Sequence, residues 1–145
     1  MKKLFILFLT LFVLELSAQE LFFTPAKAFQ NISSQETYYV FQDSKWRIWI
    51  STDAGVNCYD GNAVTCYTTK DGLVENVVFK IYEDAKGRIW FSTLSGLLCY
   101  FENNNFNSIA ANPELKRLGR SFPQHSFFIG EKDTLYFFST AASAP

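Results

Sequence analysis

Short runs of alternating hydrophobic and polar residues fill the middle of the chain, separated by turns rich in Gly, Asp and Asn. One series of four such runs covers residues 77–82, 88–93, 97–101 and 106–109. Strands of four to six residues between turn clusters are typical of antiparallel hairpins. The pattern therefore predicts an all-β structure in which four consecutive strands form one small sheet.

The chain also repeats itself with an offset of 41 residues. Residues 40–59 align with residues 81–100 without a gap, and ten of the twenty positions are identical. The identical pairs are Asp43/Asp84, Lys45/Lys86, Arg47/Arg88, Ile48/Ile89, Trp49/Trp90, Ser51/Ser92, Thr52/Thr93, Gly55/Gly96, Cys58/Cys99 and Tyr59/Tyr100. Four strands in about 41 residues make one propeller blade. We therefore predict a β-propeller built from four-stranded antiparallel blades.

The repeat divides residues 19–145 into about two and a half units. We place the units at the following residues: the first blade at about 36–76, the second at 77–109, an insertion or linker at 110–126 and the start of a third at 127–145. A closed propeller needs at least four blades, and each repeat buries its faces only against its neighbours. We therefore expect the N-terminal part of a longer propeller or a truncated reading frame. A short protein that forms rings from several chains is the alternative.

The N-terminus has the pattern of a targeting segment. Lys2 and Lys3 precede an apolar run at residues 4–14, and small residues follow at Ser17 and Ala18. As a helix the run would span about 16 Å, against a bilayer core of about 30 Å. It therefore predicts a cleaved signal peptide over residues 1–18 rather than a membrane anchor. The mature chain is expected to be exported, to the periplasm or the cell surface.

Composition and charge narrow the classes of function. The chain is 18% aromatic, which favours pleated, half-buried surfaces. With 13 basic and 14 acidic residues and no basic stripe, it lacks the positive field that nucleic-acid binding requires. Cys58, Cys66 and Cys99 are an odd number without Cys-x-x-Cys spacing, so we expect no zinc site. We expect half-buried free thiols, with a Cys58–Cys66 disulfide as the alternative and Cys58 and Cys99 apart on neighbouring blades.

No catalytic, cofactor or metal site is expected on this chain. Trp49 and Trp90 share one repeat position, so we interpret them as packing between blades rather than stacking on a ligand. Asp43 and Asp84 also share a position, which favours capping of turn amides over acid–base catalysis. His125, the single histidine, is interpreted as a plain surface residue. The positions expected to be structural in every unit are Asp43, Trp49, Gly55, Tyr59, Asp84, Gly87, Trp90, Gly96 and Tyr100.

The repeated motifs also resemble a known family. Residues 41–52 (FQDSKWRIWIST), residues 83–93 (EDAKGRIWFST), Asp60-Gly61 and residues 68–73 (TTKDGL) are similar to the two-component regulator propeller repeat. The chain departs from that pattern at Ser51 and Ser92, where Gly is usual. The resemblance covers about residues 21–106 and implies the extracytoplasmic input region of a bacterial sensor histidine kinase of the Bacteroidetes type.

The resemblance also implies partners. These are a small molecule or glycan of unknown identity, the remaining blades of a parent anchored in the inner membrane, and in one alternative a homodimer of that parent. Other hypotheses stay open. They are a secreted or surface propeller that binds carbohydrate or protein, the propeller part of a polysaccharide-active enzyme, and a structural repeat of an adhesion protein.

One mismatch between the units makes a conformational prediction. Gly87 ends the first turn of the second unit, where a left-handed residue is often needed, and Trp46 stands there in the first unit. A bulky residue at positive φ is an outlier. We therefore predict negative φ at Trp46, positive φ at Gly87 and a largely exposed Trp46 ring.

Overall fold

The computed structural model describes residues 31–118 and 127–137. The predicted signal peptide at residues 1–18 and His125 lie outside these ranges. The strands are β1 (Thr37–Gln42), β2 (Ile48–Thr52), β3 (Val56–Tyr59), β4 (Val64–Tyr67), β5 (Val78–Glu83), β6 (Ile89–Thr93), β7 (Leu98–Glu102), β8 (Asn105–Ser108), β9 (Phe127–Ile129) and β10 (Leu135–Phe137). The helical elements are η2 (Thr69–Asp71), α2 (Asn112–Leu118) and η4 (Glu131–Asp133). Among the described residues, no helix is both long enough and apolar enough to cross a bilayer.

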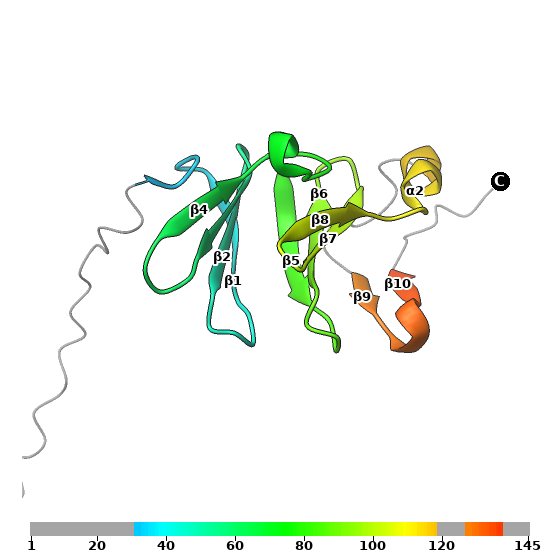
Figure 1. The fold of residues 1–145 in the computed structure, drawn as a ribbon. Coiled ribbons are helices and arrows are strands. Elements are labelled where there is room, and N and C mark those ends of the chain that lie inside the picture. The colour runs from blue at the N-terminus through cyan, green and yellow to red at the C-terminus, as the bar shows by residue number, and fades with distance from the viewer. Residues whose placement is uncertain (1–30, 119–126, 138–145) are drawn as a thin grey trace, which may run out of the picture.

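The strands form two four-stranded antiparallel sheets and one hairpin. The first sheet has the order β1-β2-β3-β4, the second β5-β6-β7-β8, and β9 pairs with β10. The two sheets lie side by side, and the hairpin follows beyond the second sheet (Figure 1). The predicted all-β fold with four-stranded, propeller-type blades is confirmed. The bounds proposed for the blade units stay a prediction.

The offset of 41 residues holds through the first two strands of each sheet. Even the register irregularity recurs, between Thr37 and Tyr39 in β1 and between Val78 and Lys80 in β5. A β-bulge of this kind bends a strand and is a built feature rather than a defect. The same local sequence pattern therefore produces the same local geometry twice.

The offset changes by one residue at the turn between the second and third strands. Thr52 N–H donates to the Gly55 carbonyl, whereas Thr93 N–H donates to the Leu97 carbonyl, one residue farther along. As a result Trp49 lies opposite Cys58, but Trp90 lies opposite Tyr100. A shift of one residue moves side chains to the other face of a strand.

This shift corrects the gap-free alignment of the third strands. Cys58 shares a face with Trp49, whereas Cys99 lies opposite Phe91 on the other face of its sheet. The prediction that the two cysteines occupy equivalent positions is therefore wrong, and so is the pairing of Tyr59 with Tyr100. Cys58, Cys66 and Cys99 are all free thiols, as expected, but none is half-buried, since Cys58 and Cys99 are buried and Cys66 is exposed.

The main core lies between the two sheets. Trp49 is 0% exposed, and its ring meets the Phe91 ring at 5.5 Å and the Phe101 ring at 5.3 Å between centroids. A second core forms where the other face of the second sheet meets the β9–β10 hairpin and α2. It contains Trp90, Leu98, Leu115, Phe127 and Ile129. The prediction that Trp49 and Trp90 pack between successive sheets is confirmed.

Helix α2 lies in the stretch of residues 110–126 for which the sequence predicts only an insertion or linker. Pro113 stands in its first turn, where proline is tolerated. The Asn112 side chain accepts from Leu98 N–H at 2.9 Å and donates to the Leu98 carbonyl at 2.8 Å. Buried Leu115 packs in the second core. These tertiary contacts hold a helix of only seven residues that is too short to be stable alone.

Candidate functional site

The turn between β1 and β2 is organised by one buried carboxylate. Asp43 is 5% exposed, and its Oδ1 accepts from the backbone N–H groups of Lys45 and Arg47, both at 2.9 Å. Its Oδ2 accepts from Arg47 Nε at 2.7 Å and from the Trp49 indole Nε1 at 2.9 Å. One carboxylate therefore fixes the turn, the arginine and the tryptophan together.

The turn between β5 and β6 repeats this network. Asp84 Oδ1 accepts from Lys86 N–H at 2.9 Å and Arg88 N–H at 3.1 Å. Its Oδ2 accepts from Arg88 Nε at 2.7 Å and Trp90 Nε1 at 2.8 Å. The prediction that these aspartates cap turn amides is confirmed. Their bonds to the arginine and the tryptophan were missed, although all three residue types recur at identical repeat positions.

These networks set the protonation of both aspartates. Burial alone would raise the pKa of Asp43, but hydrogen bonds from the Trp49 indole and from Arg47 outweigh it and lower the pKa. Burial would likewise raise the pKa of Asp84, but hydrogen bonds from Trp90 and Arg88 outweigh this effect and lower it. A carboxylate held ionised by several donors suits a structural role rather than that of a proton donor.

Each arginine also lies over aromatic rings. Arg47 Cζ is 5.1 Å from the centroid of the Trp49 ring. Arg88 Cζ is 5.2 Å from the Trp90 ring and 5.0 Å from the Tyr100 ring. A guanidinium within about 6 Å of a ring is attracted by its quadrupole. The arginine side chains are thus held by a carboxylate and by rings, which fixes the direction of their terminal nitrogens.

Trp46 does not avoid the left-handed region. Its φ is 65°, close to the 77° of Gly87, so the predicted negative φ at Trp46 is wrong. The reason lies in the turn, which keeps the bonds from Asp43 N–H to the Arg47 carbonyl and from Trp46 N–H to the Asp43 carbonyl, each at 3.0 Å. These bonds and the capping carboxylate outweigh a left-handed cost of about 1–2 kcal/mol. The predicted exposure of Trp46 is confirmed, at 79%.

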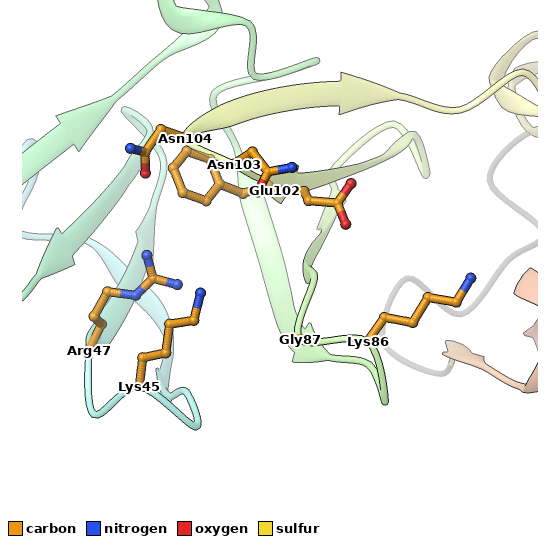
Figure 2. A pocket seen from close by; sticks show the side chains of 8 residues that line it. Lys45, Arg47, Lys86, Gly87, Glu102, Asn103 and Asn104 are labelled. Carbon is orange, nitrogen blue, oxygen red and sulfur yellow. The ribbon is translucent and has the colours of Figure 1, made fainter.

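A polar cavity of about 340 Å³ opens between the two sheets at the end that carries these turns. Its lining residues are Lys45, Arg47, Lys86, Gly87, Phe101, Glu102, Asn103 and Asn104. Lys45 and Arg47 rise from the first sheet, while Asn103 and Asn104 lie across from them in the β7–β8 turn (Figure 2). The first sheet therefore contributes two cationic groups to the cavity, and the second sheet contributes two amides together with Lys86 and Glu102. We take this cavity as the candidate binding site.

The corresponding space between the second sheet and the hairpin is about 300 Å³ and is lined by Asp84, Lys86, Arg88, Lys132 and Asp133 among others. Lys86 Nζ lies 2.8 Å from both carboxylate oxygens of Asp133, and Arg88 also donates to that carboxylate. Hydrogen bonds from Lys86 and Arg88 lower the pKa of Asp133. This inter-sheet ion pair was missed, because nothing in the third unit's sequence marked Asp133 as facing the second unit.

The other predicted structural positions lie around these networks. Gly55 and Gly96 both have positive φ, at 130° and 75°, in the turns between second and third strands. A Cβ at Gly55 would lie 2.4 Å from the Tyr67 carbonyl oxygen, so this glycine is required by a close approach of backbone. Tyr59 and Tyr100 are half-buried in β3 and β7.

The described residues provide little for metal or thiol chemistry. In residues 31–118 and 127–137, no group of three or more His, Cys, Asp or Glu side chains could hold a metal ion. Burial raises the pKa of the Cys58 thiol to about 11 and that of Cys99 to about 11. These two cysteines therefore stay protonated at neutral pH and serve as small packing residues.

Comparisons with known proteins agree with this architecture. Residues 72–95 match the model of the family described as the two component regulator propeller. The structure is similar to the crystal structure of the extracellular domain described as part of a hybrid two component system from B. thetaiotaomicron, with a TM-score of 0.52 and 21% identity over 71% of this chain. The comparison with curated proteins gave no significant match.

Residues 72–95 match the two-component regulator propeller repeat, which confirms the resemblance seen in the sequence, and the four-stranded sheets are of the propeller-blade type. The chain spans 14% of the length of the similar solved chain.

Proposed function

We propose that this chain forms part of the extracytoplasmic sensing propeller of a two-component sensor histidine kinase, and that it contributes to signal input without catalysing a reaction. The observation that carries the proposal is the repeated Asp-x-x-x-Arg-x-Trp network, whose second copy, at Asp84, Arg88 and Trp90, lies within the residues that match the regulator propeller family. The similar solved structure is an extracellular domain of a two component system, which supports the same orientation.

The cavity between the first two sheets fits such a role. It is formed by two successive blades, so a ligand bound there contacts both of them. Binding between blades would change how firmly they pack, and a change of this kind can be passed on through the propeller. The ligand, the kinase and the membrane anchor of the parent protein all belong to this proposal.

A reporter fusion tests the extracytoplasmic location. Alkaline phosphatase, which is active only outside the cytoplasm, is joined after residue 145 of the full chain in a bacterium. We expect phosphatase activity from this fusion and none from a matched fusion that lacks residues 2–18. Equal, low activity of the two fusions at equal protein levels would contradict the proposal.

A further inference from the structure

Asp133 and Gly87 occupy the same position in successive turns. Gly130 donates its N–H to the Thr134 carbonyl across the β9–β10 turn at 2.9 Å, and the β5–β6 turn closes with the matching bond from Asp84 to Arg88 at 3.1 Å. The residue before the closing carbonyl has positive φ in both turns, 60° at Asp133 and 77° at Gly87. The hairpin therefore places a carboxylate where the second sheet has no side chain.

That carboxylate fills the space between the second sheet and the hairpin. Asp133 is held between the Lys86 ammonium, at 2.8 Å from each oxygen, and the Arg88 guanidinium. Lys86 and Arg88 belong to the turn of the preceding sheet. The protein itself thus shows how this pair of cations binds a carboxylate that arrives from the next unit.

The first interface has the same cations but no such carboxylate. Lys45 and Arg47 are the counterparts of Lys86 and Arg88, and Gly87 stands where Asp133 would supply its side chain. Arg47 Nε pairs with Asp43. Within the described part of the chain, no second carboxylate lies within ion-pair distance of Arg47, and none lies within that distance of Lys45.

Two other carboxylates lie nearby, and neither takes this place. Glu83 is engaged at the apex of the first turn, where it accepts from Ser44 N–H at 2.7 Å and Ser44 Oγ at 2.6 Å. Glu102 lines the cavity, but its carboxylate points away from Lys45 and Arg47 (Figure 2). Among the described residues, Lys45 therefore has no carboxylate partner, and Arg47 has none besides the Asp43 carboxylate that its Nε already bonds.

We infer that the cavity between the first and second sheets binds a small molecule through a carboxylate, which Lys45 and Arg47 hold as Lys86 and Arg88 hold Asp133. The volume of about 340 Å³ suits a small ligand. The amides of Asn103 and Asn104, across the cavity, can bond to its polar groups. A signalling role for this ligand rests on the proposed function, but its binding does not.

Equilibrium dialysis of the full chain tests the inference with two radiolabelled probes, succinate and galacturonate, at low ionic strength. An aliphatic acid and a sugar acid share the carboxylate, so the probe that binds identifies the source of the ligand. We expect saturable binding of at least one probe, with one site per chain, and no binding of the neutral succinamide.

Three variants assign the binding to this cavity. Lys45→Gln should weaken binding at least about tenfold through loss of a charge-assisted bond. Gly87→Asp should abolish it by supplying an internal carboxylate. An aspartate fits there, because Asp133 adopts the same φ region and a Cβ at Gly87 would meet its nearest neighbour, Glu83 Oε1, at 3.8 Å. Lys70→Gln, an exposed control in η2, should leave binding unchanged.

The inference is overturned if neither probe binds saturably to the folded wild-type chain. It is also overturned if Lys45→Gln and Lys70→Gln lower the affinity equally, or if Gly87→Asp folds with a native circular-dichroism spectrum and still binds as the wild type does. Each of these outcomes leaves the export test untouched, so failure of the binding site and failure of the proposed function are distinguished.

Discussion

Trp46 and Gly87 occupy the same position in two successive turns and share a left-handed backbone, with φ of 65° and 77°. Glycine adopts this conformation without steric cost, whereas tryptophan does not. The Trp46 ring is 79% exposed, so it gains little from burial in return. A strained residue that is also exposed is a reason to look for function at that site, and Trp46 lies between two residues of the cationic cavity.

Replacing Trp46 with glycine should stabilise the chain. Relief of the left-handed strain outweighs the extra backbone freedom of glycine in the unfolded state, so we expect a gain of about 1 kcal/mol in the free energy of unfolding. Urea denaturation measures it. Trp46→Ala, which keeps a Cβ at positive φ, is the matched control and should show no comparable gain. A glycine variant less stable than the wild type would mean that the ring makes a stabilising contact.

Trp90→Ala should cost about 3–5 kcal/mol, as for other buried aromatic side chains. The Trp90 ring is in the second core, is 5% exposed and donates its indole N–H to Asp84. Trp90→Phe keeps most of the packing and removes only that bond, so it should cost less. The free energies of unfolding of both variants provide the test. A loss below about 1 kcal/mol for Trp90→Ala would show that the residue does not pack between sheets.

Stability should fall as the pH drops below about 4. The folded-state pKa values of Asp43 and Asp84 are lowered, so their contribution is present above the unfolded-state pKa of about 3.9 and is lost as the pH falls through the folded-state values. Urea midpoints measured from pH 6 to pH 3 should decrease toward the acid end. A constant midpoint over this range would argue against the two carboxylate networks.

Asp84→Asn isolates one of the two networks. The variant loses the charge that faces the largely buried Arg88 side chain, which is 10% exposed. We expect a loss of about 3 kcal/mol at neutral pH, typical of removing one partner of a buried pair, together with a shallower dependence on pH. An unchanged pH dependence would show that Trp90 and Arg88 do not lower the pKa of Asp84.

The outer face of the first sheet should promote self-association. Val40 is 60% exposed, whereas its counterpart Ile81, which faces the first sheet, is 1% exposed. An exposed apolar side chain on the outermost strand of a sheet favours contact with another chain. Sedimentation of the full chain should therefore depend on concentration, and Val40→Asp should reduce this dependence. A monomer at all concentrations would contradict the expectation.

Much of the fold could be predicted because the repeat and the local signals agree. The strand positions followed from alternation and turn residues, and the burial of Trp49 and Trp90 followed from their shared repeat position. The register of the third strands could not be predicted, since Gly55 and Gly96 align in the sequence while their turns close on different residues. Helix α2 depends on tertiary contacts of Asn112 and Leu115 that no local pattern reveals.

The candidate site was harder to predict than the fold. Arg47 and Arg88 could have been found from their repeat position and their spacing from the aspartates. The role of Gly87 could not have been found in this way. It becomes clear only from the β9–β10 turn, where Asp133 occupies the same position and its side chain binds Lys86. The φ of Trp46 was predicted wrongly. The rule that bulky residues avoid positive φ is outweighed here by the hydrogen bonds that hold this turn.

The coding sequence that follows residue 145 in the parent gene tests the central claim most directly. We expect further repeats of about 41 residues, then about 20 apolar residues that can span a membrane, then a histidine kinase region. A catalytic hydrolase or lyase region, or a cell-wall anchor, in place of the membrane span and kinase would contradict it.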